Sequence, residues 1–224
     1  MKRIVPVILL LMIAVLGCKL PSAIRDMTSG GTSKGSDGSS PLSSESRGTD
    51  PREDVVAASN KFMALPYFTA KMEGMGQTEI KSEVKFVAPD RFHVKYLGTG
   101  TGAGMEMIFL GKDMYMNANG KWTKMPSTNT SLPTLRDSFT EEGLKMLTDV
   151  KFEGPDTVDG KSTYVYSYKN VTPVGNYPFT SKIWVGEDTG LPVKIFVEYT
   201  NGALNHMKID YDTETPVTID PPVK

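Results

Sequence analysis

Apolar and polar residues alternate along most of the chain after Tyr67, and this pattern restricts the fold more than any other feature. In the run 80–89, Ile80, Val84 and Phe86 fall on one side, and lysine and glutamate residues fall between them. A period of two is typical of strands in an antiparallel sheet that has one buried and one solvated face. The same alternation recurs in the runs 91–97, 104–111, 113–118, 179–185, 191–199 and 205–211.

Short turns separate these runs. Asn119-Gly120, Asp159-Gly160 and Asn201-Gly202 each stand between two of them, and such pairs supply the positive φ angles that two-residue hairpins need. We therefore predict an α+β fold, mainly antiparallel β, with a meander of roughly nine to eleven strands. A single helix cannot cover so wide a sheet, so the sheet is expected to curl strongly.

Two segments have a helical rather than a strand period. Residues 52–65 place apolar side chains at helical spacing, with acidic residues in the first turn and Pro66 after the end. Residues 135–147 repeat the helical spacing in the middle of the meander. We expect this second helix to cover part of the apolar face of the sheet.

The first residues have the layout of a secretory signal peptide. Lys2 and Arg3 precede an apolar run that stops at Gly17. This run would span about 21 Å at ~1.5 Å per residue, which is short of the ~30 Å hydrocarbon core of a membrane. A permanent membrane helix is therefore disfavoured.

The junction Val15-Leu16-Gly17-Cys18 resembles the lipobox of bacterial lipoproteins. That resemblance implies acylation of Cys18 with fatty acids such as palmitate and removal of residues 1–17. Because Lys19 rather than an aspartate follows the cysteine, it also implies a lipid-anchored protein of the cell envelope, on the outer membrane and facing the periplasm.

A low-complexity stretch follows the cysteine. In Thr28–Asp50, eight Ser, five Gly and three Thr fill most positions, and such a segment buries too little apolar surface to fold. We predict three parts: a signal peptide at residues 1–17, a lipidated cysteine with a flexible tether at 18–51, and a folded domain at 52–224.

Composition excludes several functions. Lys and Arg number 25 against 26 Asp and Glu, and the chain has one Cys and two His. A balanced charge does not favour nucleic-acid binding, and so few Cys and His residues leave little for a metal centre or a nucleophile–base pair. We expect no enzyme activity, no metal and no cofactor.

Methionines gather on two predicted strands. Met105, Met107, Met114 and Met116 occupy alternate positions on runs joined at Gly111-Lys112. Thioethers are flexible and suit surfaces that accept ligands of varied shape. Ordinary core packing and a copper(I) site built from thioethers are the alternative interpretations.

The order of these elements resembles the LolA/LolB-like carrier fold, which outer-membrane lipoprotein-sorting proteins share with mycobacterial lipid-carrying lipoproteins. That order begins with a helix that ends near 62–68 (FMALPYF), and the most specific stretches are Thr157–Tyr168 and Trp184–Lys194. The resemblance implies a strongly curved half-barrel sheet whose concave face is covered by helices and holds acyl chains. On this basis the predicted lipid-binding residues are Met72, Ile80, Val84, Phe86, Phe92, Val94, Tyr96, Met105, Met107, Phe109, Met114, Met116, Leu135, Phe139, Leu144, Ile183, Val185, Val193, Ile195 and Val197.

The expected function is therefore that of a membrane-anchored periplasmic lipoprotein. It would bind the acyl chains of a lipid or an acylated protein in an apolar cavity, for transport or sorting. The soluble carrier of the family lacks a lipid anchor, so the chain is more similar to the anchored members. The alternative is a structural or envelope-stress signalling module that binds a protein partner.

Overall fold

The computed structural model describes residues 50–77, 79–98, 103–126, 139–171, 178–200 and 204–222. All of them belong to one unit, Thr49–Lys224. The predicted signal peptide, Cys18 and tether lie outside the described residues, as do Leu135 and the turn Asn201-Gly202.

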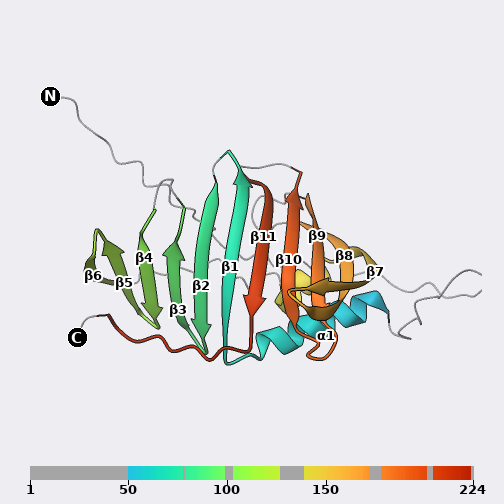
Figure 1. Cartoon of the computed structure of the whole chain (residues 1–224), viewed down its shortest axis with the longest axis horizontal. Helices are drawn as coiled ribbons and strands as arrows, with labels where there is room; N and C mark the ends of the chain where they lie inside the picture. The colour runs from blue at the N-terminus through green and yellow to red at the C-terminus, as the bar shows by residue number, and fades with distance from the viewer. Residues whose placement is uncertain are drawn as a thin grey trace, which may run out of the picture. The chain divides into compact units, whose positions relative to one another are not determined.

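Eleven strands form one antiparallel sheet within the described residues, as the alternating pattern predicted. Their order across the sheet is β6-β5-β4-β3-β2-β1-β11-β10-β9-β8-β7 (Figure 1). The strands are β1 (Tyr67–Gly76), β2 (Ile80–Val87), β3 (Arg91–Tyr96), β4 (Glu106–Leu110), β5 (Asp113–Ala118), β6 (Lys121–Pro126), β7 (Thr148–Val158), β8 (Lys161–Val171), β9 (Pro178–Gly186), β10 (Pro192–Tyr199) and β11 (Leu204–Asp212).

The sheet consists of two meanders that join in its middle. β1 to β6 pair in sequence on one side, and β7 to β11 pair in sequence on the other. The first and last strands, β1 and β11, pair with each other from Thr69 to Gly76 and so connect the two halves. The sheet is open, because β6 and β7 lie at opposite edges.

Two tight turns have the predicted geometry. Asn119 and Gly120 have φ angles of 56° and 80°, and Asp159 and Gly160 have 49° and 80°. Positive φ at both central positions defines the type I′ turn, whose twist matches that of the flanking strands. These turns fix the registers of β5 with β6 and of β7 with β8.

Helix α1 (Pro51–Met63) confirms the first predicted helix. The Asp50 carboxylate accepts a hydrogen bond from the Arg52 backbone N–H at 3.0 Å, and Pro51 occupies the first turn, where its missing N–H costs nothing. One side of the helix is buried, including Val55, Ala58, Ser59 and Phe62.

The second helix is shorter than predicted. Within the described residues, α2 covers only Glu141–Lys145, with Thr140 as its N-cap. The helical spacing continues beyond the helix because Phe139 and Leu147 are also buried, although neither belongs to it. Tertiary packing, and not a longer helix, accounts for their periodicity.

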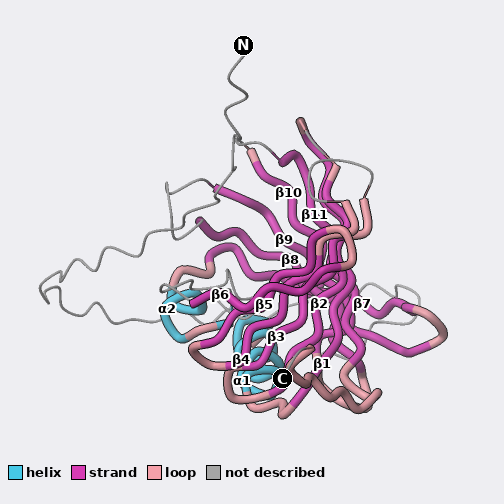
Figure 2. The backbone as a smooth tube through the Cα atoms, turned by 90° about the vertical axis from the view of Figure 1, so that its left-hand side faces the viewer, coloured by secondary structure: helices cyan, strands magenta, loops and turns pink. Residues whose placement is uncertain are grey.

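The two faces of the sheet differ in composition. The face that we call the inner face carries the apolar residues of the alternating runs, and residues of α1 and α2 pack against it. The opposite, outer face carries most of the charged residues of the strands. The sheet is curved, with both helices on the same side of it (Figure 2).

The main core lies between the helices and the half of the sheet that contains β7 to β11. Phe62 of α1 is fully buried, and its ring centroid lies 4.8 Å from Phe68, 4.9 Å from Phe139 and 4.9 Å from Tyr211. Polar contacts hold the helices in place. The Tyr166 hydroxyl donates to the Asp54 carboxylate at 2.8 Å, and the Arg52 guanidinium donates to the Leu144 carbonyl at 2.8 Å.

Candidate functional site

A row of aromatic and thioether side chains crosses the inner face of the first meander. Its members lie directly opposite one another on β1 to β6, in the order Phe68, Phe86, Phe92, Phe109, Met114 and Met125. Phe68 and Phe86 are fully buried and Phe109 is 5% exposed, whereas Met114 and Met125 are half-buried. Phe92, on β3, is also half-buried. Coverage is therefore complete at β1 and β2 and incomplete at β5 and β6.

A second row runs beside the first. It passes from Tyr211 on β11 through Ala70, Val84, Val94 and Met107 to Met116 on β5. Small or branched side chains occupy its middle, and the two methionines at its end are half-buried.

Together these rows create an apolar surface on β1 to β5 that we call the Met-rich inner surface. Its buried members are Val84, Val94 and Phe109. Its half-buried members, packed around them, are Met72, Phe92, Tyr96, Met107 and Met114. The sequence predicted that Met72, Met107 and Met114 could share one face, and the structure brings them together there.

Other predicted site residues belong to the main core under the helices. There they pack against α1, α2 and their own strands, as core side chains do. They are Phe86, Phe139, Leu144, Ile183, Val185, Ile195 and Val197.

A few predicted residues have other positions. Ile80 is half-buried on β2 opposite Gly74. The Met105 carbonyl accepts from the Tyr96 N–H at 3.0 Å, just before β4. The register between β10 and β9 is irregular at Val193. Regular alternation would place Val193 opposite Val185, but Pro192 lies there instead. The simple alternation was therefore wrong for Val193, because the irregular register adds a residue.

Sequence reasoning overlooked several hydroxyl groups on the inner face. Ser82, Tyr168, Ser181 and Tyr211 are all buried. Burial raises the pKa of Tyr168 to about 12, and it also raises the pKa of Tyr211. Both phenols therefore stay uncharged near neutral pH and can donate hydrogen bonds. In the sequence, each of these residues is a polar residue at a strand position where the alternation places apolar side chains.

The outer face carries charges of alternating sign. Lys194, Asp210, Lys71, Glu83, Lys95 and Glu106 lie directly opposite one another on successive strands from β10 to β4. Partial burial opposes ionisation of Glu106, but hydrogen bonds from Lys95 and His93 outweigh it and lower its pKa. Cross-strand pairs of opposite charge each contribute roughly 0.2–1 kcal/mol. This row neutralises itself and suits a solvated face.

The C-terminal segment covers an apolar part of the outer face, which the sequence did not predict. Val217 and Ile219 pack against Ile108 and Tyr115, and Ile219 is 4% exposed. The segment follows β11 and crosses the ends of the first strands (Figure 1).

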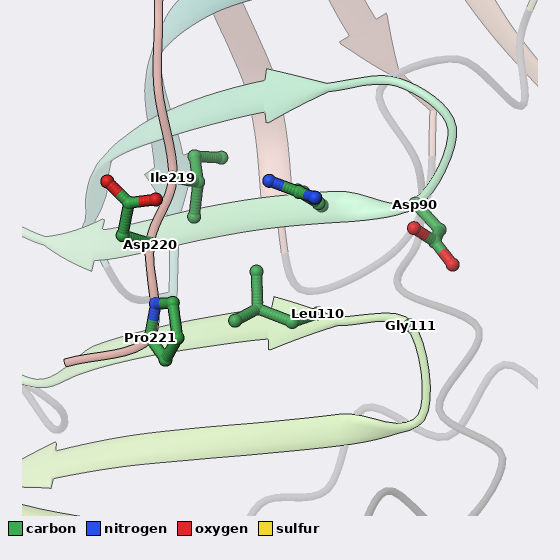
Figure 3. A pocket seen from close by; sticks show the side chains of 7 residues that line it. Asp90, Leu110, Gly111, Ile219, Asp220 and Pro221 are labelled. Atoms are coloured by element: carbon green, nitrogen blue, oxygen red, sulfur yellow. The ribbon is translucent and has the colours of Figure 1, made fainter. Parts of the chain in front are cut away.

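An open hollow of about 500 Å³ lies beside this segment, lined by Asp90, Arg91, Leu110, Gly111, Ile219, Asp220 and Pro221 (Figure 3). Its lining is as polar as it is apolar and belongs to the outer side of the molecule. The hollow is therefore separate from the Met-rich inner surface and does not suit an acyl chain.

The described residues contain no group of three or more His, Cys, Asp or Glu side chains that could hold a metal ion. Among the same residues, none of the helices has the length and apolar character needed to cross a membrane.

Comparison with solved structures gives the fold. The lipoprotein LppX of Mycobacterium tuberculosis matches with a TM-score of 0.56 and 14% identity, over 76% of this chain and 98% of that one. LprF of Mycobacterium bovis matches with a TM-score of 0.58 and 13% identity, over 78% of this chain and 97% of that one. The chain shares the fold of LppX and LprF. This confirms the resemblance at the level of architecture, since identities this low show the fold alone.

Two other comparisons gave no match. No protein-family model matches the chain, and no curated protein matches it at a significant level.

Proposed function

We propose that the protein binds acyl chains of a lipid, or of an acylated protein, on the Met-rich inner surface. The observation that carries this proposal is the incomplete coverage of the inner face. The same apolar rows are buried under helices near β1 and become half-buried at Met107 and Met114. A folded chain gains nothing from leaving such a surface partly uncovered, whereas a binding site needs it.

The chemistry of this surface fits a flexible hydrocarbon. Methionine side chains adapt to ligands of varied shape, and the attraction is non-directional. Burying one sixteen-carbon chain would contribute on the order of 10 kcal/mol gross, at ~0.8 kcal/mol per CH₂, before the cost of ordering the chain is subtracted. Exchange of cargo between partners is compatible with such binding.

The fold and the N-terminal sequence support a place in the cell envelope. LppX, which shares the fold, is a lipoprotein, and Cys18 stands where a lipobox needs it. We propose that acyl groups on Cys18 anchor the protein to the outer membrane, facing the periplasm. The tether at 18–51 would let the domain reach its cargo, without any enzymatic step.

Filling the surface tests the proposal. In residues 19–224, Met107→Trp with Met116→Trp adds bulk on the inner face, whereas Met75→Trp makes one such exchange on the outer face, where Met75 is 53% exposed. We expect binding of radiolabelled dioleoylglycerol to weaken at least about tenfold, or ~1.4 kcal/mol, in the double variant only. Equal binding by both variants would contradict the proposal and favour the partner-binding module.

A further inference from the structure

The C-terminal segment, residues 213–222, lies on the outer face without helix or strand structure. It packs against an apolar group of side chains from β2, β4, β5 and β6, which we call the outer cluster. The outer cluster consists of Ile108 and Tyr115, which are buried, and of Val87, Leu110 and Trp122, which are half-buried. One short segment therefore contacts several strands of the first meander.

Two alternate side chains fasten the segment to the outer cluster. Val217 and Ile219 pack against it, whereas Thr218 and Asp220 are exposed. Alternation of this kind is typical of extended backbone. The segment thus contacts the sheet in the way that an extended bound peptide does, with alternate side chains in apolar pockets.

Polar contacts hold only the start of the segment. The Asp212 carboxylate accepts from the Glu214 and Thr215 backbone N–H groups, each at 3.0 Å. Lys161 forms an exposed ion pair with Glu214 at 2.7 Å. Among the described residues, no hydrogen bond or ion pair joins 216–221 to another part of the chain. This part can therefore leave the sheet without leaving any backbone group there unpaired.

The sheet and the outer cluster differ in their need for the segment. Strands β4 and β5 pair with each other and β4 pairs with β3, all independently of it. Ile108 and Tyr115, in contrast, are only 6% and 5% exposed with the segment in place. Release of the segment would leave the strands paired and uncover an apolar patch, which is the kind of surface that binds proteins.

The hollow beside the segment gives an incoming chain access to this patch. It is open, has a volume of about 500 Å³ and extends from Ile219, Asp220 and Pro221 to the turns that hold Asp90 and Gly111 (Figure 3). Arg91 is the one basic side chain in its lining, and no ion pair engages it among the described residues. An acidic residue in the position of Asp220 would have this positive charge in the same hollow.

We propose that the outer cluster is a docking site for an extended segment of a partner protein, and that the C-terminal segment occupies this site until the partner displaces it. The partner's segment would carry two branched apolar residues separated by one position, as Val217 and Ile219 are, followed by an acidic residue. This site lies on the face opposite the Met-rich inner surface and does not depend on acyl binding.

Trp122 reports on the outer cluster. The chain has two tryptophans, so Trp184→Phe in residues 19–224 leaves Trp122 as the only one. Val217→Ser with Ile219→Ser, added to this background, should release the segment. We expect Trp122 emission to move to longer wavelength and its quenching by acrylamide to rise. Thr218→Ser, at an exposed neighbour, should change neither.

A synthetic peptide with the sequence of residues 213–222 serves as the partner probe. We expect it to bind the released variant and reverse the emission shift. It should bind the protein with the intact segment at least about a hundredfold more weakly, because the attached segment competes at high effective concentration. A peptide with Val217→Ser and Ile219→Ser should bind neither protein.

A second peptide tests the acidic position. Asp220→Asn in the peptide should weaken binding to the released variant about threefold, as the loss of an exposed ion pair does. Arg91→Gln in the protein should remove this difference between the two peptides. An equal effect of Asp220→Asn with and without Arg91 would contradict the acidic part of the motif.

Circular dichroism shows whether release spares the fold. The released variant, and a second variant that ends at Thr215, should keep the sheet spectrum and melt at a lower temperature. Loss of the sheet spectrum in both would show that the segment is a structural part of the domain and would refute the docking site. Folded variants that bind no peptide, or equal peptide binding with and without the intact segment, would refute it as well.

Discussion

Removing the ring of Phe62 should destabilise the domain far more than removing an aromatic ring from the outer face. Phe62 is fully buried, and it joins α1 to the sheet through Phe68, Phe139 and Tyr211, with centroids 4.8–4.9 Å away. Phe→Ala in a core costs about 3–5 kcal/mol. Each aromatic pair adds about 0.5–1.5 kcal/mol beyond burial, so we expect the upper part of that range.

The assay is thermal and urea denaturation of Phe62→Ala, monitored by circular dichroism and tryptophan fluorescence. For a domain of this size, about 4 kcal/mol corresponds to a fall in melting temperature of roughly 8–16 °C. Phe196→Ala is the matched control, because Phe196 is half-buried on the outer face. Its ring centroid lies 5.7 Å from that of His206. We expect the control to lose about 1 kcal/mol. Equal losses in both variants would refute the docking of α1 on the inner face.

Two further predictions concern the outer face. Glu106→Gln should flatten the acid limb of the stability curve. The folded-state pKa of Glu106 lies below its ordinary 4.5, so its contribution is present above about pH 4.5 and is lost as the pH falls through the lower value. Urea midpoints between pH 3 and pH 7 measure this effect, and curves parallel to wild type would contradict it. Ile219→Asp should cost about 1.5–3 kcal/mol and raise dye binding by exposing Ile108, whereas Thr218→Asp at an exposed neighbour should change neither. Identical dye binding by both variants would show that the C-terminal segment does not cover the outer cluster.

Much of the sheet could be predicted because strand alternation and turn type depend on residues that are close together in the sequence. The alternation that placed Val84, Phe86, Val94 and Phe109 on one face requires only that successive side chains of a strand point to opposite sides. The turn at Asp159-Gly160 was equally predictable, since a type I′ turn depends on the two residues that form it. These features need no knowledge of distant contacts.

Other features depend on contacts that a local pattern does not contain. Val217 and Ile219 belong to a proline-containing segment without regular structure, so nothing nearby in the sequence shows that they cover Ile108 and Tyr115. The irregular register at Val193 likewise arises from pairing between β10 and β9. In each case the partner lies on another strand, and the sequence signal is spread over distant positions.

The candidate site illustrates the same division. The sequence predicted the inward methionines, because their spacing is regular. It could not show that Phe86 and Ile183 would be buried under the helices while Met107 and Met114 remained half-buried. The buried Tyr211 hydroxyl, which has no hydrogen-bond partner among the described residues, emerges only when the partners of the buried polar groups are known.

Native mass spectrometry of residues 19–224 tests most directly whether the inner face holds acyl chains. The protein would be purified from a bacterial host without harsh detergent, alongside the Met107→Trp, Met116→Trp double variant. We predict that wild type carries close to one acyl-containing molecule per chain, identified after organic extraction, and that the double variant is largely empty. Wild-type protein without bound lipid, whose melting temperature does not respond to added acyl esters, would contradict the account.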